Sequence, residues 1–140
     1  ADISIGYDNL KEELKSISKG KGVDVIFDPV GGELFEESSR ALSRYGKILV
    51  IGFASGKIPK FPINLALVKE FDIVGVFWGN FCVKEPLVNA ANFKDLFAMF
   101  EEGQIKPFVV ETYPLEQTGY AIELLAKREA IGKIAIKVRD

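Results

Sequence analysis

The stretch Val23-Asp24-Val25-Ile26-Phe27-Asp28-Pro29-Val30-Gly31-Gly32 decides the fold of this 140-residue chain, together with a second stretch of the same kind, Lys47-Ile48-Leu49-Val50-Ile51-Gly52-Phe53-Ala54-Ser55-Gly56. Each is an apolar run that ends in a turn rich in small residues, and the residues between them predict a helix. Near-continuous Val/Ile runs are typical of strands buried on both faces, and parallel strands need a crossover such as a helix. The sequence therefore predicts an α/β fold, the second half of a doubly wound, Rossmann-type parallel sheet.

The rest of the chain continues this alternation. A third apolar run, residues 72–78, predicts a third parallel strand, and we expect it at a sheet edge because no further crossover follows it. Caps, apolar periodicity and glycine stops predict helices over residues 8–20, 33–46, 86–102 and 116–127. The last two are expected to bury one apolar side each, formed by Leu87, Val88, Ala91, Leu96, Phe97 and Phe100 and by Ala121, Leu124 and Leu125. Two more strands are predicted over residues 108–113 and 133–138. The composition changes between residues 103 and 106, which predicts a boundary near residue 105.

Composition excludes several kinds of chemistry. The chain has no histidine and one cysteine, Cys82, so it contains no Ser-His-Asp triad, no Cys-His pair and no zinc site of the usual ligands. The lone cysteine also favours a reducing compartment, which predicts a cytoplasmic protein. A net charge of −2 offers no basic field for nucleic acid or an anionic membrane. No apolar run has the ~20 residues of a membrane-spanning helix.

The common glycine motifs for phosphate binding are also missing. The sequence has no G-x-G-x-x-G and no G-x-x-x-x-G-K-[ST], and the run Gly20-Lys21-Gly22 precedes a predicted strand rather than following one. The chain begins at Ala1, and its single methionine is Met99. We therefore expect a segment excised from a longer polypeptide.

Four motifs in order along the chain indicate a family: Val23–Gly32, Gly46–Phe53, Ile73–Gly79 and Gly132–Ile134. Together they resemble the NADPH:quinone oxidoreductases, the zinc-free, zeta-crystallin-like branch of the medium-chain dehydrogenase/reductases. The resemblance implies that residues 1–105 are the carboxyl-terminal part of a dinucleotide-binding domain and that residues 106–140 return toward a catalytic domain. It also implies hydride transfer from NADPH to a quinone or another α,β-unsaturated carbonyl.

The family's cofactor contacts map onto the ends of the three predicted strands. Glycine lets a backbone approach a ligand closely, and we expect amides left free in these turns to bind the nicotinamide half. The predicted cofactor-binding residues are Pro29, Val30, Ile51, Gly52, Phe53, Ala54, Ser55, Val76, Phe77 and Trp78. Because Phe77 and Trp78 alternate along a strand, at least one is expected in the core. No metal ligand is predicted, and the phosphate-binding loop of the family is absent, so the isolated chain should bind NADPH poorly and be inactive.

Other roles remain open. The conceivable proton-transfer groups near the end of the chain are Tyr113, Tyr120 and Lys133, but a tyrosine in an apolar segment is more often a core ring, so catalytic residues stay unassigned. The resemblance also implies a homodimer through strand 72–78, whose interior lacks the charges and prolines that protect an edge. Alternatives are an enoyl-thioester reductase, an alcohol dehydrogenase-like enzyme, or a non-enzymatic nucleotide-binding or crystallin-like protein.

Overall fold

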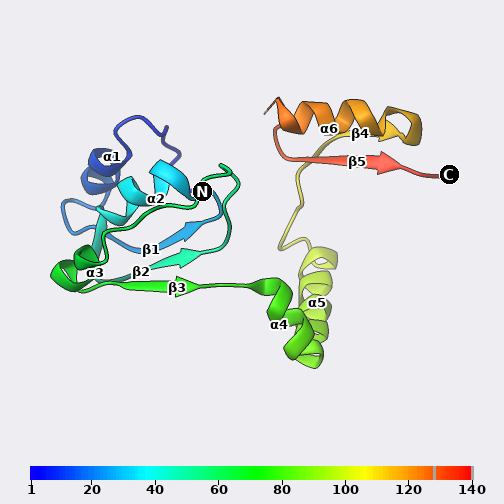
Figure 1. The fold of residues 1–140 in the computed structure, drawn as a ribbon. Helices are drawn as coiled ribbons and strands as arrows, with labels where there is room; N and C mark the ends of the chain where they lie inside the picture. Colours follow the sequence, from blue (N-terminus) through cyan, green and yellow to red (C-terminus); the bar gives the residue numbers. More distant parts are fainter. Residues whose placement is uncertain (128, 140) are drawn as a thin grey trace. The chain divides into compact units, whose positions relative to one another are not determined.

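Each half of the chain folds around its own parallel sheet in the computed structural model, which describes residues 1–127 and 129–139 (Figure 1). The chain divides into two units, residues 1–84 and residues 85–140. The α/β class and the parallel arrangement of the strands are confirmed. The functional boundary expected near residue 105 falls inside the second unit and stays a prediction.

The first sheet carries the two stretches that decide the fold. It contains β1 (Val23–Asp28), β2 (Leu42–Val50) and β3 (Asp72–Gly75), all parallel, in the order β1-β2-β3. Ile26 lies opposite Ile48, which in turn lies opposite Ile73. Because parallel strands in register bring their carboxyl ends to one edge of a sheet, the turns after β1 and β2 emerge side by side.

Helices cover one face of this sheet. They are α1 (Leu10–Ile17), α2 (Gly32–Ser39) and α3 (Asn64–Lys69), and a further helix, α4 (Trp78–Lys84), follows β3. Figure 1 shows α1 and α2 over the same face, and α2 contacts β1 and β2. The core between helices and sheet contains Phe35, Leu42, Ile48 and Phe71, and the Phe61 ring packs edge-on against Phe35 at 5.5 Å between ring centroids.

The opposite face of this sheet is open. Val25 and Phe27 point away from the helices and remain 59% and 65% exposed. The expectation of strands buried on both faces is therefore wrong for residues 1–84, because the helices α1 and α2 lie on one side only. The composition of the apolar runs suits a sheet covered on both faces, and the helices of residues 1–84 cover one of them.

Two boundaries differ from the sequence prediction. The helix expected to continue to Gly46 ends at Ser39, and Leu42 already begins β2. Gly46 does not stop a helix: it lies within β2, where an added Cβ would come within 3.1 Å of the Val23 carbonyl oxygen. The third strand ends at Gly75 rather than at Trp78, which is the first residue of α4.

The second unit begins with α5 (Pro86–Glu101), which has proline in its first turn and is followed by Gly103 at φ +72°, both as predicted. Then come β4 (Val109–Pro114), a 3₁₀ turn η1 (Leu115–Gln117), α6 (Thr118–Ala126) and β5 (Lys133–Lys137), with β4 and β5 parallel. Figure 1 shows α6 running alongside this two-stranded sheet.

The apolar side of α5 was expected to face a core. Its apolar side chains are instead exposed in the described structure: Leu87, Val88, Ala91, Leu96, Phe97 and Phe100. In α6 the expectation holds for Ala121, which is buried, but not for Leu125. Among the described residues, no helix is both long enough and apolar enough to cross a bilayer.

Candidate functional site

Two turns meet where β1 and β2 end. Here we call residues 28–32 the first turn and residues 51–57 the second turn. The carbonyl oxygen of Asp28 accepts hydrogen bonds from the Ile51 amide at 3.0 Å and the Gly52 amide at 3.4 Å. The two turns thus begin as a continuation of the ladder between the strands.

Further along, the second turn continues to donate to the first. The Ala54 amide donates to the Pro29 carbonyl oxygen at 3.0 Å, and the Ser55 amide donates to the Val30 carbonyl oxygen at 3.0 Å. The Ser55 hydroxyl donates to the same Val30 oxygen at 2.8 Å. The predicted site residues of the two turns, Pro29, Val30 and Ile51 to Ser55, are therefore brought together in one cross-linked structure.

These bonds change what the backbone can offer a ligand. The amides of the second turn were expected to be free, but those of Ile51, Gly52, Ala54 and Ser55 all donate to the first turn, and the Gly56 amide donates to the Phe53 carbonyl. Between residues 51 and 56, where the structure describes every residue, only the Phe53 amide makes no such bond. Small residues here serve the fit between the two turns.

The glycines of the two turns differ in what they allow. Gly31 has φ +69° and ψ −153°, and an added Cβ would lie 2.8 Å from Cδ1 of Phe53. Gly32 has φ +60°, and its added Cβ would lie 3.0 Å from the Ser55 hydroxyl. Gly52, by contrast, lies outside the positive-φ region, and a Cβ there would meet only the Pro29 oxygen at 3.4 Å. Backbone conformation and close neighbours therefore require glycine at positions 31 and 32, whereas a Cβ could be accommodated at position 52.

The third predicted group is only partly brought in. The Val76 amide donates to the Val50 carbonyl oxygen at 3.0 Å, which places Val76 beside the start of the second turn. Phe77 and Trp78 leave the strand and are 77% and 60% exposed. The expectation that one of them lies in the core is wrong, because the alternation of a strand no longer applies where α4 begins.

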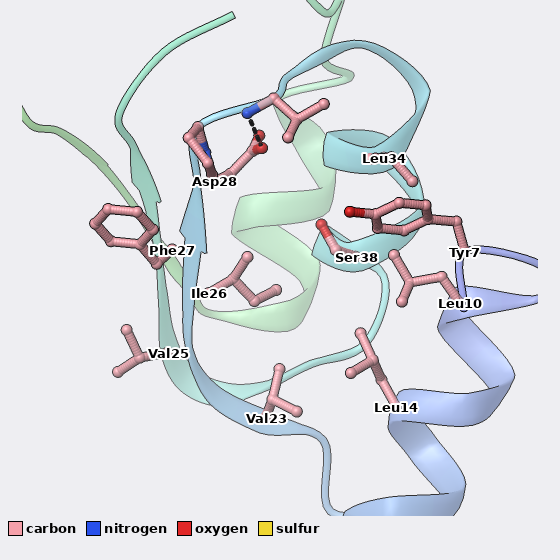
Figure 2. A pocket seen from close by; sticks show the side chains of 12 residues that line it. Tyr7, Leu10, Leu14, Val23, Val25, Ile26, Phe27, Asp28, Leu34 and Ser38 are labelled. Atoms are coloured by element: carbon pink, nitrogen blue, oxygen red, sulfur yellow. Dashed lines mark hydrogen bonds between the residues drawn. The ribbon is translucent and has the colours of Figure 1, made fainter. Parts of the chain in front are cut away.

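A pocket of about 360 Å³ runs along β1 (Figure 2). Its walls are mostly apolar, and Figure 2 shows Tyr7, Leu10 and Leu14 reaching it from the side of α1 and Leu34 and Ser38 from α2. Asp28, Pro29 and Val30 line it as well, so the first turn separates this pocket from the second turn. The sequence does not predict this pocket, because its lining comes from three elements whose contacts no periodicity indicates.

Side chains with shifted pKa values lie away from these turns. A hydrogen bond and the charge of Glu70 raise the pKa of Arg44, and burial, followed by the charges of Lys15, Lys11 and Arg40, lowers the pKa of Lys69. In the second unit, the Tyr113 hydroxyl donates to the Glu111 carboxylate, and the Tyr113 ring packs edge-on against Tyr120. Among residues 1–127 and 129–139, no group of three His, Cys, Asp or Glu side chains could hold a metal ion.

Comparison with known proteins gives a consistent picture. The model of the zinc-binding dehydrogenase family matches residues 1–136. Quinone oxidoreductase-like protein 2 from Bos taurus is 32% identical over 141 residues, which cover 99% of this chain and 40% of that protein. The structure of Escherichia coli quinone oxidoreductase complexed with NADPH is 29% identical with a TM-score of 0.81, covering 96% of this chain and 42% of the other. A structure of an NAD-dependent alcohol dehydrogenase is 25% identical with a TM-score of 0.83, covering 99% and 38%.

The chain spans about 40% of the length of the curated relatives it matches. The family model matches residues 1–136, a range that includes both turns, the three-stranded parallel sheet and nearly all of the β4–β5 pair. The chain therefore belongs to the zinc-binding dehydrogenase family within the medium-chain dehydrogenase/reductases, with quinone oxidoreductase-like proteins among its relatives.

Proposed function

We propose that this chain forms the nicotinamide-facing part of an NADPH site in an enzyme that reduces a quinone or another α,β-unsaturated carbonyl. The observation that carries the proposal is the pair of cross-linked turns at the carboxyl ends of β1 and β2. Ligands of open α/β sheets bind at this edge. The resemblance to a quinone oxidoreductase solved with NADPH supports the choice of cofactor.

The residues of the turns suit the uncharged half of a dinucleotide. Position 52 has space for a flat ring to approach, and the Phe53 amide has a hydrogen to donate. A pyrophosphate, however, needs several unpaired amides or a helix N-terminus, and the amides of the second turn are already committed to the first. NADPH bound there would supply the hydride, while Pro29, Val30, Gly52 and Phe53 would orient the ring and exclude water from it.

An alcohol dehydrogenase-like activity is the second candidate, because an NAD-dependent alcohol dehydrogenase matches nearly the whole chain at 25% identity. The two candidates share the sheet and the turns, so they differ only in what the rest of the enzyme presents to the nicotinamide. The acceptor used in an activity assay separates them.

We further propose three properties of the protein, which concern the isolated chain, its assembly and its compartment. The isolated chain is inactive and binds NADPH weakly, since it lacks the G-x-G-x-x-G loop. Two copies pair through the outer edge of β3, which is an edge strand without proline. The enzyme works in the cytoplasm, which the single cysteine favours.

A chimera tests the function. The matching 42% of Escherichia coli quinone oxidoreductase is replaced by this chain, and NADPH oxidation is followed with a quinone as acceptor. Quinone-dependent oxidation is the expected result, and the chimera carrying Gly52→Val should need more NADPH for half-maximal rate. A folded chimera that does not oxidise NADPH with a quinone contradicts the proposal that this chain forms the nicotinamide side of the site.

A further inference from the structure

Asp28 is a buried acid in the first turn that the cofactor prediction does not include. Its residue is 6% exposed, and its side chain lies on the helix-covered side of β1 (Figure 2). Its Oδ1 atom accepts hydrogen bonds from the Val30 amide and the Gly31 amide, both at 2.9 Å. Asp commonly closes a turn in this way, by binding amides two and three residues ahead.

The first turn needs this support. Gly31 at φ +69° and ψ −153° occupies a backbone region that is essentially restricted to glycine, which is also the residue with the greatest conformational freedom to lose. The Asp28 carboxylate binds the amide of Gly31 itself, and hydrogen bonds to a charged acceptor are stronger than those between neutral groups. The Val30 amide shares a planar peptide group with the Pro29 carbonyl, and the Gly31 amide shares one with the Val30 carbonyl. By holding these two amides, the carboxylate fixes the directions of both carbonyl groups.

Those two carbonyls hold the second turn. The Pro29 oxygen accepts from Ala54, and the Val30 oxygen accepts from the amide and the hydroxyl of Ser55. The Asp28 backbone carbonyl binds Ile51 and Gly52 directly, but its side chain makes no hydrogen bond to the second turn. An effect of the carboxylate on Ala54 and Ser55 therefore passes through the carbonyls of Pro29 and Val30. We propose that Asp28 is a positioning residue: by fixing the first turn, its carboxylate holds the second turn at the edge of the sheet where a ligand binds. The consequence for a ligand rests on the function proposed above.

The two carboxylate oxygens suggest a matched pair of variants. Oδ2 is buried and has no hydrogen-bond partner among the described residues, whereas Oδ1 makes both bonds. Asp28→Asn keeps an oxygen at Oδ1 and loses no bond at Oδ2, while Asp28→Ala loses both bonds. Ser55→Ala removes the hydroxyl bond to Val30 directly and leaves Asp28 intact.

Amide hydrogen exchange in the 140-residue chain measures the positioning. In Asp28→Ala, exchange at Val30, Gly31, Ala54 and Ser55 should accelerate about tenfold relative to Ile48 in β2, as expected for loss of bonds to a charged group. Asp28→Asn keeps an acceptor but not its charge, so it should restore part of the protection at all four amides. Ser55→Ala should accelerate exchange at Ala54, at Ser55 and at Lys57, whose amide donates to the Ser55 hydroxyl at 3.2 Å. It should leave exchange at Val30 and Gly31 unchanged, because the first turn keeps its own bonds to Asp28.

Other results overturn the proposal. If Asp28→Ala affects Val30 and Gly31 but not Ala54 and Ser55, Asp28 holds only its own turn. If amide exchange at Ile48 accelerates by the same factor, Asp28 stabilises the fold as a whole and does not position the second turn in particular. Should Asp28→Ala not fold, Asp28→Ser takes its place and the same comparison decides, since a serine hydroxyl forms such turns more weakly. Titration of the same variants with NADPH tests the proposed function separately. If the wild-type chain binds no NADPH, the proposed function is contradicted, but the conclusion from hydrogen exchange about Asp28 is unaffected.

Discussion

Glycine has two different roles in the pair of turns, and the structure separates them. Gly31 is required by its own backbone and by Phe53, because an added Cβ would lie 2.8 Å from the Phe53 ring. Gly52 is not required by either, since its backbone lies outside the positive-φ region and its nearest neighbour would be 3.4 Å away. A glycine that the fold does not need, at the edge where ligands bind, is a candidate for contact with a ligand.

Matched alanine variants test this difference. Gly31→Ala should lower the free energy of unfolding by about 2 kcal/mol, because both backbone strain and overpacking contribute. Gly52→Ala should change it by less than about 0.5 kcal/mol, as for an open site. Urea unfolding followed by circular dichroism measures both. Equal destabilisation by the two variants would show that position 52 is as constrained as position 31 and would remove the reason to place a ligand beside it.

At the residue level, the sequence predicted which residues gather but not how they bond. The spacing of the apolar runs was enough to place Pro29 and Val30 beside the second turn, because parallel strands bring their ends together. It could not show that Ala54 and Ser55 donate inward, since a hydrogen bond between turns depends on the local φ and ψ of both. Nor did it single out Asp28, although an Asp-Pro pair before two glycines is a recognisable turn signal.

Among the elements, the short helix α3 supports the end of α2. The Lys69 ammonium, at the end of α3, donates to the carbonyl oxygens of Arg40 at 2.6 Å and Leu42 at 3.1 Å. These carbonyls follow the last turn of α2, where a cation is favourable. Burial lowers the pKa of Lys69, so the hydrogen bonds offset a cost of desolvation.

Lys69→Met tests which of these effects is larger. We expect the free energy of unfolding to fall by about 1 kcal/mol. The loss of a charged donor to the two carbonyl oxygens should cost more than is gained by no longer burying the ammonium group. Lys60→Met, at an exposed lysine in the loop before α3, is the control and should change little. Thermal unfolding of both variants gives the comparison. A Lys69→Met chain as stable as wild type would mean that water satisfies the carbonyls equally well.

Element types were predictable from the sequence to a greater extent than element ends. Pro86 and Gly103 correctly bracketed α5, because both residues act through local backbone geometry. The start of β2 at Leu42 was missed, since Leu42 fits an apolar helix face and an apolar strand equally well. The strand end at Gly75 was missed because Phe77 and Trp78 have high strand propensity, which the turn into α4 overrides.

For the molecule as a whole, apolar surface is the main departure from the sequence expectation. Phe27 on the first sheet and Phe97 and Phe100 on α5 were expected inside a core and are exposed. Patterning predicts which side chains suit burial, but burial also requires a second layer to cover them. The chain spans about 40% of the length of its relatives, so their additional residues are the natural place to seek such a layer.

The outer edge of β3 gives a prediction about assembly. The Val76 amide bonds inward to β2, so Gly75, one residue earlier, presents its amide outward. If two copies pair through this edge, light scattering should report a dimer, and Gly75→Pro should reduce it to a monomer by removing the outward donor. A Cβ at Gly75 meets nothing within 4 Å, and proline is accepted in edge strands where the backbone amide faces outward, so the fold should tolerate the change. A wild-type monomer, or a dimer unaffected by Gly75→Pro, would rule out pairing through this edge.

Titration of the ¹⁵N-labelled chain with NADPH, followed by amide chemical shifts, tests the central claim that the two turns form the nicotinamide side of a cofactor site. The account predicts shifts confined to amides of the first and second turns, Phe53 foremost, with a Kd of about 1 mM or weaker because no loop holds the pyrophosphate. NADH should give the same shifts, since no residue of these turns is expected to contact the 2′-phosphate that distinguishes NADPH from NADH. Shifts centred on the pocket along β1 or on the β4–β5 unit, no shifts at all, or low-micromolar affinity would contradict the account.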